Sequence, residues 1–324
     1  MKALQVVAPR QAEFVDAPRP ELKPGHALVR TRYLALCGSD IWMLDHNPPE
    51  RYPFPVGTTG HEVIGEIVAL EGEHRDVGVG DLTLTLAPDH RGMSEYYLAE
   101  VDNLLPLPKG KTPEELLMAQ QLGTVIFAAR QLPSVIGKTV AVVGQGSAGL
   151  WFNVMLKRFG AGRVIALDNH QHRMTLSERY GADAVICGAD RHAVDQFRDA
   201  NEGQLADIVI EAAGREAAIN LSFRLAKQNT AFMLQFGLPR PPLQVNYDEM
   251  FWKCLTVKSI VHAASEAGHT STRHALELIG SGALDVKPVL THRFPFSQVL
   301  EAFELQRTAA DGAVKTIVEM PDGS

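Results

Sequence analysis

The chain has 324 residues, of which 45% are hydrophobic and 21% charged, and its net charge is −7 at pH 7. This composition supports a normal globular core, and the length favours two domains of roughly 100–200 residues each. Because the charges are intermixed and no basic run occurs, we exclude nucleic acid and anionic membrane as main partners. No apolar run reaches a membrane-spanning length and the N-terminus lacks a signal-like core, so we expect a cytoplasmic protein.

The first 130 residues are rich in Val, Thr, Gly and Pro and predict a β-rich domain of short strands. Two apolar segments, 26–36 and 61–70, lie between turn sequences and are predicted strands.

From residue 137 onward, short β-branched segments alternate with helix-like segments, which is typical of parallel βαβ units. We therefore predict a doubly wound parallel sheet over 131–265, within an α/β fold. The predicted strands are 138–144, 163–168, 183–188, 206–214 and 230–237, and the predicted helices are 147–160 and 170–182.

The last segment, 266–324, contains two predicted helices, 271–284 and 297–308, and a final strand, 313–320. We expect this segment to return to the first domain. The predicted domains are thus 1–130, 131–265 and a C-terminal segment 266–324.

The first strand of the βαβ region ends in a G-x-G-x-x-G pattern formed by Gly144, Gly146 and Gly149, with Ser147 and Ala148 between. In this context, after a strand and before a helix, the pattern predicts a dinucleotide site. The first glycine allows a tight turn, the second lets a pyrophosphate approach, and the third lets helix and strand pack closely. The alternative is a glycine-rich turn that binds another ligand.

Asp168 ends the next predicted strand, 19 residues past Gly149. A carboxylate at this place accepts hydrogen bonds from the adenosine ribose and repels a 2′-phosphate. Asn169 and His170 follow it rather than an arginine. We therefore predict NAD, with NADP less favoured.

The first domain combines Cys37, Ser39 and Asp40 in one short stretch with His61 and Glu62 before a predicted strand. Thiolate, imidazole and carboxylate are ligands that zinc accepts in catalytic sites. The alternative is that the cysteine and histidine are core residues. The chain has three cysteines in all, too few and too scattered for a disulfide framework.

The sequence resembles the zinc-type medium-chain dehydrogenase/reductase superfamily, and within it the polyol and amino-cyclitol dehydrogenases. The resemblance covers nearly the whole chain in family order, and it is carried by LCGSD, TTGHEVIGEIVALEG, VGDL, GMSEYYL, GKTVAVVGQGSAGL, VIALD, ADIVIEAAG and GAVKTIVEM. It implies a GroES-like catalytic domain that carries the metal, a Rossmann domain, and an NAD(P)-dependent alcohol dehydrogenase.

The resemblance also implies roles. Cys37 and His61 match the first two zinc ligands, and Glu62 matches an acid behind the metal that can enter its shell. Ser39 matches the hydroxyl that passes on the substrate proton, and Asp40 a carboxylate that orients a ligand histidine.

Three further residues complete the predicted cofactor set. Thr124 matches a threonine beside the nicotinamide, and Gly237 follows the strand 230–237. Lys315 matches a basic residue near the cofactor phosphates, although it could also be a solvated strand end.

The chain departs from the family pattern in three places. Segment 83–91 stands where the family has a four-cysteine structural zinc lobe and contains no cysteine, so we expect one catalytic zinc and no structural zinc. Gln120 stands where the family has a glutamate ligand. Trp42 replaces a histidine of the polyol enzymes. Because Gln120 carries no charge, either Glu62 coordinates in its place, or the metal is held more weakly, or the site binds no zinc.

The predicted function is hydride transfer between NAD and a secondary alcohol or its ketone, the alcohol being a polyol, cyclitol or sugar-like compound. One alternative is a zinc-free quinone or enoyl reductase of the same superfamily, and another is a catalytically inactive nucleotide-binding sensor. The resemblance suggests a homodimer or homotetramer. Other histidines, among them His170, His172, His262 and His274, are interpreted as surface or structural residues.

Overall fold

The structure, a computed structural model, describes residues 1–72, 74–86, 90–260 and 263–321. The chain forms two compact units, one of Met1–Gly123 with Ala264–Ser324 and one of Thr124–Ala263. The domain boundaries inferred from the sequence stay a prediction. Among the described residues, no helix has both the length and the apolar character needed to cross a bilayer.

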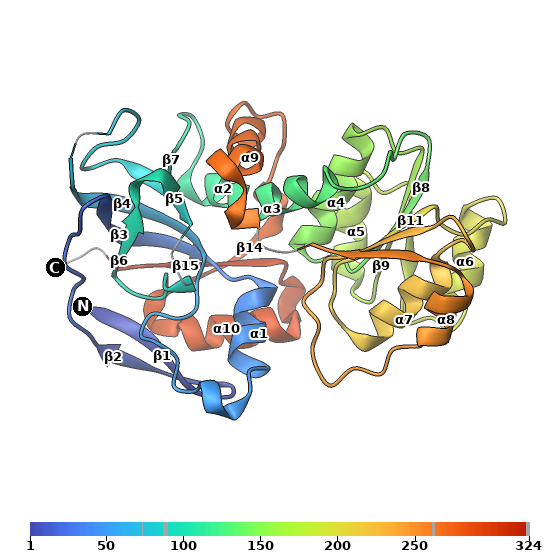
Figure 1. Cartoon of the computed structure of the whole chain (residues 1–324), viewed down its shortest axis with the longest axis horizontal. Helices are drawn as coiled ribbons and strands as arrows, with labels where there is room; N and C mark the ends of the chain where they lie inside the picture. Colours follow the sequence, from blue (N-terminus) through green and yellow to red (C-terminus); the bar gives the residue numbers. More distant parts are fainter. Residues whose placement is uncertain (73, 87–89, 261–262, 322–324) are drawn as a thin grey trace. The chain divides into compact units, whose positions relative to one another are not determined.

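The sheet of the second unit has six parallel strands among the described residues, in the order β10-β9-β8-β11-β12-β13 (Figure 1). Five of the six were predicted from short β-branched runs, and the edge strand β13 was not. The strands are β8 (Thr139–Val143), β9 (Arg163–Asp168), β10 (Ala184–Cys187), β11 (Ile208–Glu211), β12 (Phe232–Gln235) and β13 (Thr256–Ser259).

Helices connect these strands, as expected for right-handed βαβ crossovers. The helices that follow β8, β9, β10 and β11 in the chain each pack on one or two strands of the sheet. They are α4 (Ser147–Arg158), α5 (Gln171–Arg179), α6 (Ala193–Ala200) and α7 (Glu216–Leu225), and a short α8 (Tyr247–Trp252) precedes β13.

The main sheet of the first unit is mixed, and its strands come from both ends of the chain. Its described order is β14-β15-β3-β4-β5-β7, with β6 also paired to β3. The strands are β3 (His26–Ala35), β4 (Glu62–Leu70), β5 (Leu82–Leu86), β6 (Tyr96–Glu100), β7 (Leu104–Pro106), β14 (Leu290–Pro295) and β15 (Lys315–Glu319), and β1 (Lys2–Ala8) pairs separately with β2 (Gln11–Asp16). Strand β15 lies beside β3 in antiparallel register, so the C-terminal segment completes the sheet begun near the N-terminus (Figure 1).

The helices of the first unit have local sequence reasons. Thr112 caps α2 by accepting a hydrogen bond from the backbone N–H of Glu115, whose side chain in turn accepts from the N–H of Thr112. Pro113 occupies the first helical position, where its missing N–H costs nothing. The helices are α1 (Gly38–Asp45), α2 (Pro113–Leu117), α9 (Thr270–Gly280) and α10 (Val299–Thr308), and α3 (Ala119–Ala129) spans the boundary between the units.

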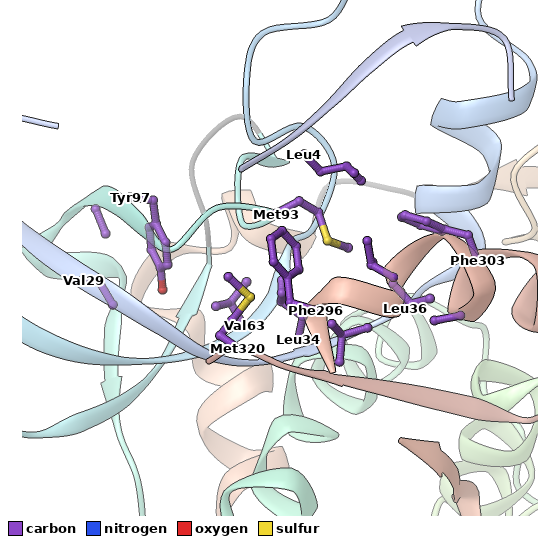
Figure 2. Close-up of a cluster of buried hydrophobic side chains, with 14 of the residues drawn as sticks. Leu4, Val29, Leu34, Leu36, Val63, Met93, Tyr97, Phe296, Phe303 and Met320 are labelled. Carbon is purple, nitrogen blue, oxygen red and sulfur yellow. The ribbon is translucent and has the colours of Figure 1, made fainter. Parts of the chain in front are cut away.

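A hydrophobic cluster beneath the strands of the first unit gathers residues that are distant in sequence. Figure 2 shows Leu36 and Phe303 on one side of it, and Val63, Met93 and Met320 at its centre. Leu36 directly precedes Cys37, and Val63 directly follows Glu62. Because both are buried in this cluster, the core fixes the backbone that carries the candidate metal ligands.

The predicted fold class is confirmed: an α/β protein with a mixed sheet in the first unit and a Rossmann-type parallel sheet in the second.

Candidate functional site

Three strand ends meet in the first unit and carry the candidate metal site. In the antiparallel pair β3·β4, Ala35 lies opposite Glu62, so Cys37, just past the end of β3, lies close to His61, just before β4. On the other side of β3, the backbone N–H of Leu36 donates to the carbonyl of Thr316 at 2.9 Å. Lys315, the first residue of β15, therefore reaches the same edge.

Cys37, His61 and Glu62 form a group that could hold a metal ion. One ligand atom from each, the Sγ, a ring nitrogen and a carboxylate oxygen, lies within 4.8 Å of the others. Sulfur, imidazole and carboxylate suit zinc, whose bonds to them are about 2.0–2.3 Å long. The donor set and spacing therefore fit one zinc ion.

Asp40 ties the two sides of this group together from inside helix α1. Its Oδ2 accepts a hydrogen bond from the backbone N–H of Cys37 at 2.8 Å, and its Oδ1 accepts one from the N–H of Gly60 at 3.0 Å. Burial raises the pKa of Asp40, but nearby His61 and these two N–H groups outweigh it and hold the pKa at about 2. Asp40 is thus a buried anion that fixes the backbone next to both candidate ligands.

His61 lies between Asp40 and Ser39. Its Nδ1 is 3.5 Å from Asp40 Oδ1, which is long for a hydrogen bond, and its Nε2 is 3.5 Å from Ser39 Oγ. Burial lowers the pKa of His61, yet the carboxylate of Asp40 raises it well above the ordinary value. Binding a metal therefore requires His61 to release a proton.

Glu62 and Lys315 form a buried ion pair. The Nζ of Lys315 lies 2.7 Å from Oε1 and 2.6 Å from Oε2 of Glu62, and neither residue is exposed beyond 1%. Burial lowers the pKa of Lys315, but the negative charge of Glu62 outweighs it and raises the pKa above the usual value. The interpretation of Lys315 as a solvated strand end is wrong, because the side chain is buried beside the candidate metal ligands.

The glutamine whose amide contacts the thiol is Gln121. Its Nε2 lies 3.7 Å from Cys37 Sγ, and its Oε1 is buried. The family resemblance of the sequence predicted Gln120 instead, which is also buried on helix α3. Consecutive side chains on a helix point about 100° apart, so the two amides face different surroundings. The sequence alone does not tell which of two adjacent glutamines faces the cysteine.

His90 is a second neighbour of the site that the sequence did not indicate. Its ring lies edge-to-face against the ring of His61, with centroids 4.7 Å apart. The backbone N–H of Gly92 donates to the carbonyl of Gly60 at 2.9 Å, which ties this segment to the one that carries His61. Residues 87–89 of the segment 83–91 lie outside the described part of the chain.

In the second unit, the three glycines make the turn from β8 into α4. Gly144 has a φ of +97°, which favours glycine. A Cβ on Gly149 would stand 1.9 Å from the carbonyl oxygen of Gly144, whereas a Cβ on Gly146 would meet no atom within 4 Å. Gly146 therefore leaves open space at the N-terminus of a 12-residue helix, where free N–H groups favour an anion. Ser147 and Ala148 form the first turn of that helix.

We expect Gly149→Ala and Gly146→Ala to separate packing from phosphate binding. Gly149→Ala should lower the free energy of unfolding by about 1–3 kcal/mol, because the added methyl overlaps a backbone carbonyl. Gly146→Ala should leave stability unchanged but weaken NADH binding about tenfold, because its methyl fills the approach to the helix N-terminus. Chemical denaturation and a fluorescence titration with NADH measure the two effects, and equal losses in both variants would contradict the assignment.

Asp168 ends β9 beside this turn. Its Oδ2 accepts from the N–H of Gln145 at 2.7 Å, and its Oδ1 accepts from the N–H groups of Asn169 and His170 at 2.8 and 2.9 Å. Three donors orient the carboxylate: Oδ1 accepts two of them, and Oδ2 accepts one and keeps a lone pair for a further donor. This arrangement suits a carboxylate that receives a hydrogen bond from a ribose hydroxyl.

The other predicted residues lie in several elements. Thr124 is half-buried in α3, and Gly237 follows β12. His172 is on α5 and His274 on α9, while His262 lies outside the described residues.

Comparison with known proteins places this geometry in a family. Residues 23–109 match the alcohol dehydrogenase GroES-like domain, and residues 148–280 match the zinc-binding dehydrogenase domain. An alcohol dehydrogenase of Cupriavidus necator is 27% identical, with 98% of each chain covered. A probable D-xylulose reductase A of Aspergillus clavatus is 26% identical, with 95% of this chain and 93% of the relative covered. The solved structure of zinc dependent alcohol dehydrogenase 2 from Streptococcus pneumonia, 22% identical, superposes with a TM-score of 0.86 over 100% of this chain and 99% of that one. The chain belongs to the zinc-type medium-chain dehydrogenase/reductase superfamily.

Proposed function

We propose that this protein is a zinc-dependent oxidoreductase that transfers hydride between NAD and a secondary alcohol or its ketone. The observation that carries the proposal is the grouping of Cys37, His61 and Glu62, whose ligand atoms lie within 4.8 Å of one another. The relatives named alcohol dehydrogenase and D-xylulose reductase support a polyol, cyclitol or sugar-like alcohol as the substrate class.

Zinc would be held by Cys37 and His61, with Glu62 as a third ligand whenever it leaves Lys315. In its present position the Glu62 carboxylate is shared with the Lys315 ammonium. Gln121 Nε2 lies 3.7 Å from Cys37 Sγ and would stabilise the negative charge of a zinc-bound thiolate. Gln120 stays a predicted ligand.

When bound, zinc lowers the pKa of a coordinated alcohol and NAD accepts its hydride. The chain's own groups would move the proton and hold the ligands. Ser39 Oγ lies 3.5 Å from Nε2 of His61, and this hydroxyl would receive the alcohol proton. Asp40 would keep Cys37 and His61 in place through its contacts with the backbone and the imidazole.

NAD would bind on the second unit, with its pyrophosphate at Gly146 and its adenosine ribose at Asp168. A 2′-phosphate would meet the charge of the Asp168 carboxylate, which favours NAD over NADP. Burial lowers the pKa of Arg173, and the carboxylate of Asp168 opposes that effect, so a cation lies near the same place. The substrate panel is therefore run with NADP as well as with NAD.

One observation favours a second candidate, a zinc-free reductase of the same superfamily that acts on a quinone or an activated double bond. The Lys315 ammonium already neutralises Glu62. Without that carboxylate, a metal would have a single negative ligand, the thiolate, together with a neutral imidazole.

The deciding experiment combines metal analysis with a substrate panel. We expect about one zinc per chain in protein purified without added metal. We also expect oxidation of secondary alcohols with NAD that is lost on chelation and restored by zinc. No zinc together with reduction of quinones or enones would support the second candidate. NADH binding without turnover of any substrate would indicate a nucleotide-binding sensor.

We also propose that the chain forms a homo-oligomer through the edge of the second unit. Among the residues that the structure describes, strand β13 is the last strand of its sheet, and all four of its residues are exposed. Next to it, Tyr247, Phe251 and Trp252 of α8 are 60%, 56% and 71% exposed. An unpaired strand edge flanked by exposed aromatic side chains suits pairing with a second copy of the same edge.

Light scattering in solution tests this proposal. We expect a dimer or tetramer for the wild type and a smaller species for Trp252→Glu. The matched control is Ile136→Glu, because Ile136 is 74% exposed on the same unit but outside α8 and β13. A monomeric wild type, or equal effects of both substitutions, would contradict the proposal.

A further inference from the structure

We infer that Glu211 is a positioning residue that joins the ends of β11 and β12 into one rim for the nicotinamide half of the cofactor. The inference rests on the proposed binding of NAD to the second unit. Glu211 is the last residue of β11 and is 0% exposed. It was not among the residues that the sequence indicated.

The Glu211 carboxylate accepts hydrogen bonds from the loop that follows β11 and from the end of the neighbouring strand β12. Its Oε1 accepts from the backbone N–H groups of Ala213 and Gly214, both at 2.8 Å. Its Oε2 accepts from Nε2 of Gln235, the last residue of β12, at 2.5 Å. One side chain thus binds its own loop on one oxygen and the neighbouring strand on the other.

The backbone of Glu211 makes a second link to the same neighbour. Its carbonyl oxygen accepts from the N–H groups of Phe236 and Gly237, both at 2.9 Å. The two loops are in such close contact that a Cβ on Gly237 would stand 2.2 Å from the backbone nitrogen of Gly214. The side chain and backbone of Glu211 together hold this contact.

Burying a carboxylate in a strand end is expensive, so a role in plain packing would be better served by an apolar residue. Burial raises the pKa of Glu211, and the hydrogen bonds from Ala213, Gly214 and Gln235 oppose that rise. An apolar side chain could accept none of these three hydrogen bonds. The identity of this residue is therefore explained by the shape of the two loops rather than by the strand.

The sheet topology assigns these loops to the second half of a dinucleotide. The strand order reverses between β8 and β11, and such folds bind one mononucleotide on each side of that point, at the carboxyl ends of the strands. Asp168 on β9 marks the adenosine side. The ends of β11 and β12 therefore face the nicotinamide side. The N–H of Ala212 donates to the carbonyl of Val143 at 2.8 Å, which places the Glu211 loop directly against the glycine turn.

The test compares a ligand that occupies both halves with one that occupies only the first. NADH and AMP are titrated into wild type, Glu211→Ala and Glu211→Gln by calorimetry. We expect Glu211→Ala to raise the Kd of NADH about tenfold or more while the Kd of AMP stays within about twofold. Glu211→Gln keeps one oxygen for Ala213 and Gly214 but turns an NH₂ group toward Gln235, so we expect a partial effect of about threefold on NADH alone.

The matched control is Asp207→Asn. Asp207 lies directly before β11, at its opposite end, where it accepts from the N–H of Thr139 at 2.9 Å and pairs with Lys227 at 2.8 Å. This variant should lose stability without changing the ratio of the NADH and AMP constants.

Two results would overturn the inference: an unchanged Kd for NADH in the Glu211 variants, or a parallel loss of NADH and AMP binding. If Glu211→Ala does not fold, the Kd values of NADH and AMP for Glu211→Gln are compared instead. A wild type that does not bind NADH would instead overturn the proposed function, so the two failures are distinct.

Discussion

Cys37→Ala should lose its zinc and show a kcat/KM lower by about 10³-fold or more. Of the two ligands that can carry a negative charge, Glu62 is ion-paired with Lys315 and Cys37 is not. Without the Cys37 sulfur, the remaining candidate ligands are the His61 imidazole and that paired carboxylate. Zinc contributes several kcal/mol to the stabilisation of charge in the transition state, which corresponds to a loss of at least about three orders of magnitude. Metal analysis of the purified variant and steady-state kinetics with the best alcohol of the panel measure the two effects.

The matched control is Cys254→Ser, because Cys254 is an exposed free cysteine of the second unit. It should keep both the zinc and the activity. Turnover by Cys37→Ala at the wild-type rate would end the proposed metal chemistry. Loss of zinc without loss of turnover would support the second candidate function, a zinc-free reductase.

The second large effect concerns stability. Lys315→Met in metal-free protein should lower the free energy of unfolding by about 3–5 kcal/mol, because it leaves the Glu62 carboxylate buried without its cation. Methionine keeps most of the apolar volume of the lysine stem, so the loss of packing is small. Urea denaturation in the presence of a chelator measures the change.

A double variant and a more exposed pair provide the controls. Lys315→Met combined with Glu62→Leu should recover most of the lost stability, since an apolar pair needs no counter-charge. Lys227→Met breaks an ion pair with Asp207 whose side chains are 29% and 22% exposed, and it should cost about 0–1 kcal/mol. If Lys315→Met lowers the free energy of unfolding no more than Lys227→Met does, the buried pair contributes no more to stability than the partly exposed one, which would contradict this prediction.

The elements that the sequence predicted best are those with a strong local pattern. Strands β8 and β9 are short β-branched runs, and the glycines between β8 and α4 fix the turn. In the second unit, helices α6, α7 and α8 and strand β13 were not predicted. All four residues of β13 are exposed, so this strand has no apolar alternation on which a prediction could rest. Helix α6 buries Ala193 and Phe197 on one face, but it has only eight residues and follows the turn residues Gly188 and Asp190, so its pattern is short.

The residues of the candidate site also fall into those that a local motif predicts and those that only the folded structure reveals. Cys37 and His61 stand in short motifs that imply a role from sequence alone. The pairing of Lys315 with Glu62 joins residues 253 positions apart, and no local pattern reports such a contact. Glu211 is similar, because its partner Gln235 lies 24 positions away on the neighbouring strand β12.

The order in which the strands leave the ribosome has a consequence for biosynthesis. Strand β3 is translated before the second unit, and its neighbour β15 is translated after it. The second unit, by contrast, is one continuous stretch of chain, Thr124–Ala263. Because domains fold as units during synthesis, this middle stretch can fold while the first unit still waits for its final strand. Nascent chains arrested before β15 should therefore bind NADH, if the proposed function holds, and lack the complete candidate metal site.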